Sequence, residues 1–67
     1  MEVAVPALVE ALKDESPEVR VAAIQALGRI GRRAKAAIPA LTQAMTATDP
    51  DIRAEAARAL EKVNLPR

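Results

Sequence analysis

The sequence contains no cysteine, no histidine and no phenylalanine, tyrosine or tryptophan. Without cysteine it forms no disulfide, and without cysteine or histidine it lacks the side chains that most zinc sites and nucleophile–base triads use. The remaining acid–base candidates are carboxylates at predicted helix starts, where helix capping accounts for them. These absences indicate a non-enzymatic protein with no catalytic residue, no metal site and no cofactor.

Long hydrophobic runs and an excess of one charge are missing as well. No apolar run approaches the roughly 18 residues that span a membrane, so no membrane partner is expected. The net charge of +1 argues against a general binder of nucleic acids or membrane surfaces. The absence of cysteine favours a cytoplasmic protein, and it is equally compatible with an excised or designed fragment.

What the sequence does have is an internal repeat. Shifting the chain by 33 residues places three segments over their copies, namely 6–8 over 39–41, 19–20 over 52–53, and 26–27 over 59–60. Self-similarity at such a period is typical of repeat architectures. We therefore expect a single domain over residues 1–67, with one repeat at about 1–33 and another at about 34–67.

The segment 16–31 carries a complete set of helix signals. Ser16 is a good N-cap, Pro17 suits the first helical position, and Glu18 places negative charge at the positive end of the helix dipole. Gly31 can adopt the left-handed conformation that ends a helix. The second copy carries the same signals at Asp49, Pro50, Asp51, Asn64 and Pro66. The agreement of the two sets predicts a long helix in each repeat.

Hydrophobic spacing adds a first helix to each repeat, so we expect helices at about 3–13, 17–30, 36–46 and 50–63. Connections of only a few residues force consecutive helices to fold back antiparallel. Each hairpin then has an apolar stripe that it cannot bury alone, and two such hairpins stack side by side. The predicted fold is all-α, a fragment of an α-solenoid made of two antiparallel helical hairpins.

The motif V/I-R-x-x-A-x-x-A-L, which follows a Ser-Pro or Asp-Pro turn in both copies, resembles HEAT repeats. The similarity is greatest to the short HEAT-like repeats first described in phycobilin lyases, and it covers essentially the whole chain. In such families an Asp of the turn and an Arg of the second helix form a ladder between repeats. The resemblance therefore implies a pair between Arg20 and Asp49, while Ser16 departs from the pattern.

Two surfaces are expected to serve binding. In a solenoid the second helices line the concave face, and the helical wheel places there Glu18, Val21, Gln25, Arg29, Ala54, Glu55, Arg58 and Lys62. This face mixes charges and lacks the Trp and Tyr anchors of strong binding sites. A basic patch of Arg29, Arg32, Arg33 and Lys35 lies in a stretch, 19–48, that contains no acid. The patch could hold a phosphate, an acidic peptide or a nucleic-acid backbone.

The thin core favours self-association. Half of the residues are hydrophobic, but alanine dominates them, and alanine buries little apolar area. Chains this short usually need a disulfide, a metal or association to remain folded, and only association is available here. An uncovered apolar face with Val3, Val5 and Val9 on the first helix invites a second copy.

The function predicted from the sequence is a non-enzymatic structural or protein–protein interaction module that associates into a homo-oligomer. One alternative is a partner-binding segment of a larger HEAT-repeat scaffold or lyase-type protein. The other is a weak phosphate or nucleic-acid contact through the basic patch at residues 29–35. The partner is accordingly a second copy or another protein, with nucleic acid the least favoured.

Overall fold

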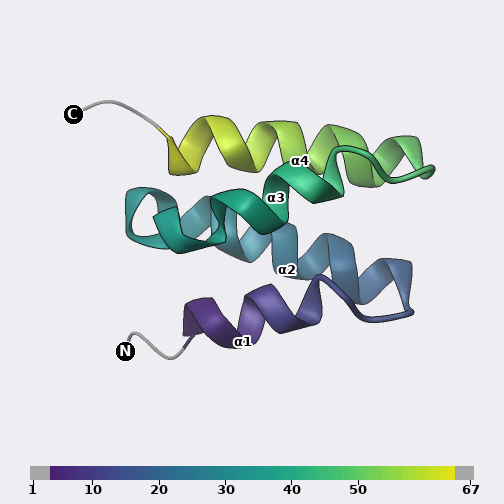
Figure 1. The fold of residues 1–67 in the computed structure, drawn as a ribbon, viewed down its shortest axis with the longest axis horizontal. Helices are drawn as coiled ribbons and strands as arrows, with labels where there is room; N and C mark the ends of the chain where they lie inside the picture. Colours follow the sequence, from purple (N-terminus) through teal and green to yellow (C-terminus); the bar gives the residue numbers. More distant parts are fainter. Residues whose placement is uncertain (1–3, 65–67) are drawn as a thin grey trace.

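A computed structural model describes residues 4–64 of the chain. The regular elements are helical throughout this range, which confirms the all-α prediction. In chain order they are α1 (Ala4–Ala11), α2 (Pro17–Ile30), η1 (Gly31–Ala37), α3 (Ile38–Ala44) and α4 (Pro50–Val63) (Figure 1).

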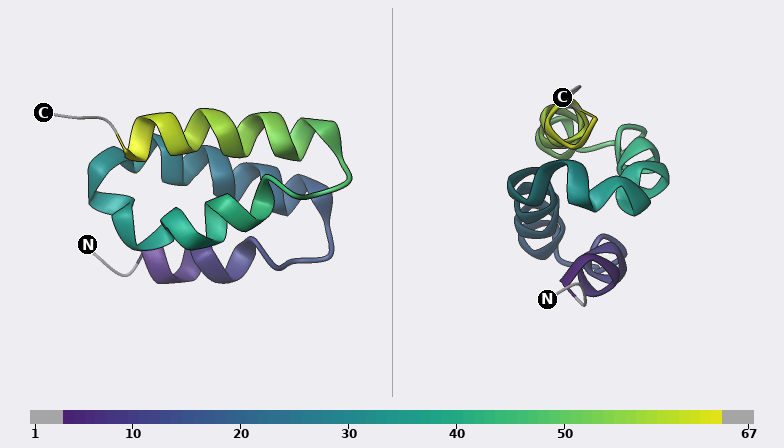
Figure 2. Two further views of the ribbon diagram at one scale, coloured as in Figure 1. Left: turned by 45° about the horizontal axis from the view of Figure 1, so that its top comes forward. Right: turned by 90° about the vertical axis from the view of Figure 1, so that its left-hand side faces the viewer.

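The helices form two hairpins that lie side by side. The chain reverses between α1 and α2 and again between α3 and α4, so each pair is antiparallel (Figure 1). The end-on view in Figure 2 places α2 and α4 on one side of the molecule and α1 and α3 on the other. The main contact between the hairpins joins α2 to α4. This arrangement is that of a short helical solenoid.

The core is small and is centred on the packing of α2 against the second hairpin. Five large side chains are completely or almost completely buried, namely Ile24, Leu27, Leu41, Ile52 and Val63. Buried alanines fill much of the remaining core. Helix α1 has no buried residue and contributes only half-buried side chains. The first helix is therefore the least anchored element of the fold.

The third predicted helix differs from expectation. We expected a connection at residues 32–35 and one helix over 36–46, whereas the chain passes from α2 into the 3₁₀ segment η1 and then into the shorter α3. Gly31 has a φ of +73°, and Ala34 interrupts the helical geometry with φ −97° and ψ 24°. Ala34 is fully buried, so the chain bends at a residue that packs in the core. The prediction of four continuous helices is thus confirmed only in part.

Both long helices begin as the sequence indicates. The Ser16 hydroxyl accepts a hydrogen bond from the backbone N–H of Val19, and the Asp49 carboxylate accepts one from Asp51 N–H at 2.8 Å. These side chains satisfy amides that a helix start leaves without partners. Asn64 follows α4 as predicted, and its N–H donates to the carbonyl of Leu60. Pro66, the other predicted stop signal, lies outside the described residues.

The start of α2 carries a carboxyl group, that of Glu18, with a lowered pKa. The pKa of its carboxyl lies below the ordinary value of about 4.5, because the carboxylate accepts hydrogen bonds from its own backbone N–H and from the Ser16 hydroxyl. A lowered folded-state pKa contributes stability that is present above the unfolded-state pKa and lost as the pH falls through the folded-state value. We expect the thermal midpoint, followed by circular dichroism from about pH 5 downwards, to fall less in Glu18→Gln than in the native chain. Equal pH dependence in the two proteins would contradict this assignment.

Candidate protein-interaction surfaces

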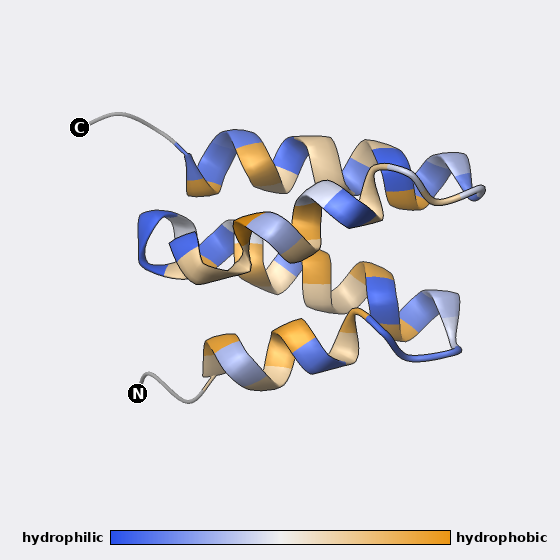
Figure 3. Ribbon diagram, viewed as in Figure 1, coloured by the Kyte–Doolittle hydropathy of each residue, from blue (hydrophilic) through white to orange (hydrophobic). Residues whose placement is uncertain are grey.

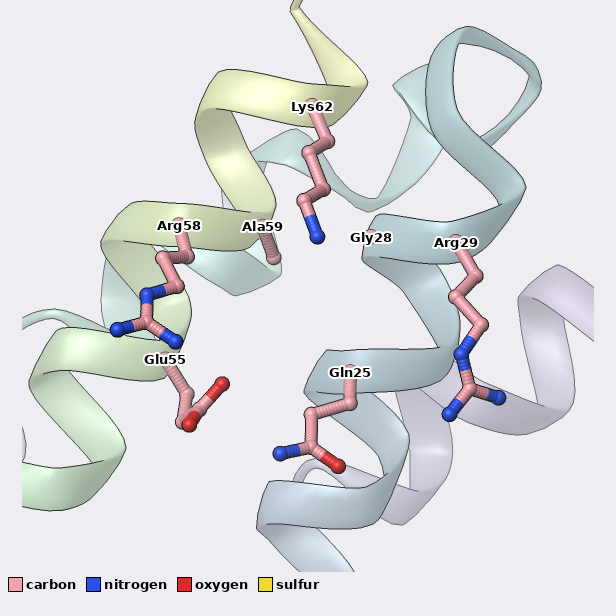
Figure 4. A pocket seen from close by; sticks show the side chains of 7 residues that line it. All are labelled: Gln25, Gly28, Arg29, Glu55, Arg58, Ala59 and Lys62. Atoms are coloured by element: carbon pink, nitrogen blue, oxygen red, sulfur yellow. The ribbon is translucent and has the colours of Figure 1, made fainter.

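A polar groove runs between α2 and α4 (Figure 4). Its volume is about 260 Å³. The residues that line it are Gln25, Gly28, Arg29, Glu55, Arg58, Ala59 and Lys62. Five of these seven belong to the concave face predicted from the helical wheel, so the fold brings the predicted residues of both hairpins together.

Small residues at the floor of the groove allow α2 and α4 to approach closely. Gly28 is buried, and a methyl group at its position would lie 3.4 Å from the Ala59 Cα and 3.5 Å from the Ala59 Cβ. The methylene chain of Lys62 passes over the same point, 3.6 Å away. The groove is therefore shallow at this end, with backbone and short side chains below and a lysine stem above.

The walls of the groove carry more positive than negative charge. Arg29 comes from α2, while Arg58, Lys62 and the single carboxylate, Glu55, come from α4 (Figure 4). In the part of the chain that the structure describes, the one ion pair within 4.0 Å joins Glu10 of α1 to Lys13 in the turn that follows it. The groove charges are not paired with one another, so an acidic segment could meet them without first breaking an internal salt bridge.

Three residues of the predicted concave face lie away from the groove. Glu18 and Val21 line a separate, more open depression near the helix starts, together with Asp49 and Asp51. Ala54 is exposed and lines neither hollow. The predicted face is thus divided into a basic part at the middle and end of α2 and α4 and an acidic part at their start.

Replacing the floor glycine tests how closely α2 and α4 pack. Glycine in a helix interior destabilises it relative to alanine, and at position 28 the added methyl group would make ordinary van der Waals contacts. We expect Gly28→Ala to raise the free energy of unfolding by about 0.5–1 kcal/mol in urea titrations. Gly28→Leu, the matched control, should lower it because the larger side chain forces the helices apart. A stabilising leucine would show that the helices are not in close contact.

Arginine side chains tie the turn of each hairpin to its second helix. Arg20 donates to the backbone carbonyls of Asp14 at 2.7 Å and Glu15 at 3.2 Å. Arg53 makes the same pair of bonds to the carbonyls of Ala47 at 2.8 Å and Thr48 at 3.1 Å. Each acceptor of Arg53 lies 33 residues after the corresponding acceptor of Arg20. We call this repeated contact the arginine clamp.

The arginine clamp replaces the predicted pair between Arg20 and Asp49. Arg20 bonds within its own hairpin, Asp49 caps α4, and no ion pair joins the two among residues 4–64. Arg20 and Asp49 also line different hollows of the surface. The prediction was wrong because the Arg20 guanidinium donates to two carbonyls of its own turn, and the Asp49 carboxylate accepts a hydrogen bond at the start of α4.

The comparison with protein families agrees with this geometry. The family model of HEAT repeats matches residues 4–67. The chain belongs to the HEAT repeat family. HEAT repeats generally act as scaffolds for protein–protein interaction and are typically non-enzymatic. No curated protein and no solved structure matches the chain.

The HEAT fold also contains an apolar groove that the sequence did not predict. It lies between α1 and α3, on the side opposite the polar groove, and has a volume of about 260 Å³. Its apolar lining includes Val9 of α1, Leu12 just after α1, the buried Ile24 and Ile52, and three alanines of the second hairpin. The sequence feature that could have indicated this groove is the alanine spacing at positions 40, 44 and 47. These side chains are too short to fill the space between α1 and α3.

The valines expected to form a bare face on the first helix are less exposed than predicted. Val5 and Val9 are half-buried and pack against the core, and Val3 lies outside the described residues. The side chains of the basic patch, by contrast, are all exposed, with Arg29 at the end of α2 and the other three in η1. Figure 3 shows this hydrophilic bend at one end of the molecule and the hydrophilic turn after α1 at the other.

The sequence contains no apolar run long enough to span a membrane, so no membrane-spanning helix was expected. Within residues 4–64, none of the helices combines the length and the hydrophobicity needed to cross a bilayer.

Proposed function

We propose that this HEAT module is a non-enzymatic scaffold element that associates with further copies of itself. The observation that carries the proposal is the burial pattern. Among residues 4–64 the core contains only five large side chains that are completely or almost completely buried, and none of them comes from α1. A hydrophobic core in a chain below about 70–80 residues rarely supplies more than 3–5 kcal/mol, so burial at an interface would add a substantial part of the stability.

Two exposed hydrophobic residues support association. Among the described residues the large hydrophobic side chains that remain exposed are Val19, at 39%, and Met45, at 41%. They lie on different hairpins, at the start of α2 and the end of α3. A contact that covers both residues removes them from water, and a partner that binds only the folded chain shifts the folding equilibrium by mass action.

Sedimentation equilibrium across a wide concentration range tests the proposal. We expect a mass above the 7.1 kDa of one chain at high concentration, with helix content from circular dichroism decreasing on dilution. A fully helical 7.1 kDa species at every concentration would show that two repeats suffice without a partner.

A second candidate function is the binding of another protein in the polar groove. The specific observation is the excess of unpaired positive side chains around one carboxylate. The natural ligand of such a groove is an acidic segment of a larger scaffold assembly, held mainly by electrostatic attraction.

A peptide titration separates this binding function from self-association. Heptaglutamate serves as the probe, and we expect Arg29→Ala with Arg58→Ala to weaken its binding by roughly threefold to tenfold relative to the native chain. Lys35→Ala, outside the groove, is the matched control and should have a smaller effect. An unchanged dissociation constant in the double variant excludes the groove, and a larger loss in Lys35→Ala would move the site to the basic patch.

A further inference from the structure

Each side of the interface between the two hairpins has an equivalent surface on the outside of the module, made by the residues 33 positions away. Residues 33 apart occupy equivalent positions, as the arginine clamp shows. Ile52 of α4 packs against the first hairpin and is 1% exposed, whereas its counterpart Val19 is 39% exposed. The first hairpin therefore presents outward the same side that the second hairpin buries against it.

Other residues on this outer face of the first hairpin are likewise more exposed than their equivalents in the second hairpin. Ala37, Ala59 and Val63 are buried in the second hairpin. Their counterparts in the first hairpin are exposed or half-buried, namely Ala4, Ala26 and Ile30. We define the leading face as Ala4, Val19, Ala26 and Ile30. It has the composition of a surface that packs against helices, and no helix within residues 4–64 covers it.

The opposite outer face belongs to the second hairpin. It is equivalent to the side of the first hairpin that is buried in the internal interface. Leu12 is half-buried and lines the apolar groove against the second hairpin, and its counterpart Met45 is 41% exposed. Ile24 and Leu27 are completely buried, while their counterparts Ala57 and Leu60 are half-buried. We define the trailing face as Met45, Ala57, Leu60 and Glu61. The two exposed large hydrophobic residues thus lie one on each face.

One contact of the internal interface predicts a charge pair between copies. Gly28 lies against Ala59 and the stem of Lys62. The counterparts of these three residues are Glu61, Ala26 and Arg29. If the internal register is repeated between chains, Glu61 of one copy stands where Gly28 stands, beside Ala26 and Arg29 of the next copy. A side chain larger than alanine does not fit at the spacing of α2 and α4, so the helices of two copies lie further apart and the exposed Glu61 carboxylate meets Arg29 at the edge of the contact. The trailing face then supplies the anion Glu61, and Arg29, next to Ala26 and Ile30 of the leading face, supplies the cation.

We propose that copies of the chain stack head to tail, with the trailing face of one copy on the leading face of the next, in the register of the internal α2–α4 contact. The proposal rests on the self-association proposed above and names its surfaces. Because the two faces are different, the contact is heterologous and leaves one face open at each end. Stacking therefore extends the solenoid from chain to chain and gives arrays that lengthen with concentration.

The alanine-rich faces limit the strength of each contact. Ala57 and Thr42 occupy positions where the internal interface has Ile24 and Val9, so less apolar area is buried between chains than within one. Glu61 and Arg29 are both exposed, so a charge pair between them contributes specificity and register more than affinity. Weak, concentration-dependent stacking is the expected behaviour.

Cysteine cross-linking tests the register directly, because the chain has no native cysteine. The Gly28 and Ala59 positions have a Cβ separation of 3.5 Å, which suits a disulfide. Gly28→Cys with Ala59→Cys in one chain is therefore the internal control. Mixing a Glu61→Cys chain with an Ala26→Cys chain in a glutathione buffer should give mixed dimers, identified by mass, several-fold above the like-with-like dimers.

The outcomes separate this inference from the proposed function. Suppose that the disulfide of the internal control forms and the native chain associates, but mixed dimers are no more abundant than like-with-like dimers. The proposed register is then wrong, while self-association is retained. If the native chain remains a monomer at every concentration, self-association fails and the stacking fails with it.

A charge exchange provides a second, independent test. Glu61→Arg alone and Arg29→Glu alone place like charges at every junction, and each should weaken association by roughly threefold to tenfold. Mixing the two variants, or combining both changes in one chain, restores opposite charges and should restore association. Glu15→Arg and Lys35→Glu make the same changes of charge outside both faces and serve as controls. Equal weakening in the controls, or no recovery in the mixture, would overturn the pair.

Discussion

Leu27→Ala is expected to unfold most of the chain at room temperature. Leu27 is completely buried in α2, within the cluster that joins the two hairpins. Removing a buried leucine side chain costs about 2–5 kcal/mol, from lost burial and from the cavity left behind. A core of this size rarely provides more than about 3–5 kcal/mol in total. Circular dichroism should therefore show the loss of most helix.

Leu60→Ala is the matched control for this prediction. Leu60 lies 33 residues after Leu27, in the same place on the second long helix, but it is only half-buried. The same deletion should therefore lower the free energy of unfolding by a smaller amount, measured as the urea midpoint. Equal losses at the two positions would contradict the view that the core is centred between the hairpins.

Arg20→Ala is expected to lower the free energy of unfolding by about 1–2 kcal/mol, because the arginine clamp of the first hairpin is lost. The turn carbonyls of Asp14 and Glu15 would keep only water as a partner. The clamp fixes the α1–α2 turn together with local bonds such as that from the Ser16 N–H to the Asp14 carboxylate, while α1 itself has no buried residue to hold it in place. Hydrogen exchange of the α1 amides should accelerate more than that of the α4 amides.

Arg20→Met separates the hydrogen bonds from the packing of the side chain. Methionine retains an apolar stem of similar length but has no donor, so it should be as destabilising as alanine if the bonds to the carbonyls are what stabilise the turn. A methionine variant as stable as the native chain would show that stem packing, and not the clamp, is responsible.

The caps and the repeat could be predicted from the sequence because they are local. Ser16 and Asp49 precede proline at a helix start, and their role depends only on residues two or three positions away. The side of each long helix that faces the core follows equally from helical spacing. Five of the eight residues assigned to the concave face line the polar groove, because each long helix carries its part of that face at helical spacing. That the face binds a partner stays a prediction.

The missed features depend on distances that spacing alone does not determine. Ala34 bends the chain because a buried alanine fits close to the other hairpin, and nothing in its local sequence marks a break. The hydrogen-bond acceptor of Arg20 depends on which oxygen atoms its guanidinium reaches in the folded chain, and these are the turn carbonyls of Asp14 and Glu15. The apolar groove depends on how far apart α1 and α3 lie, which is set by the packing of α2 against α4.

Together these features describe a module with unequal sides. The side formed by α2 and α4 has a basic groove, the side formed by α1 and α3 has an apolar one, and the outer faces each expose one large hydrophobic residue. HEAT repeats generally serve protein–protein interaction, and we propose the outer faces as the surfaces that contact a further copy of the chain.

The coupling of folding to association is tested most directly by the urea midpoint of the native chain at protein concentrations that differ by about 100-fold. If association stabilises the folded state, the midpoint rises with protein concentration, because mass action favours the associated folded chain. A midpoint that is the same at every concentration, with a full helical signal before the transition, would mean that one chain holds its fold alone.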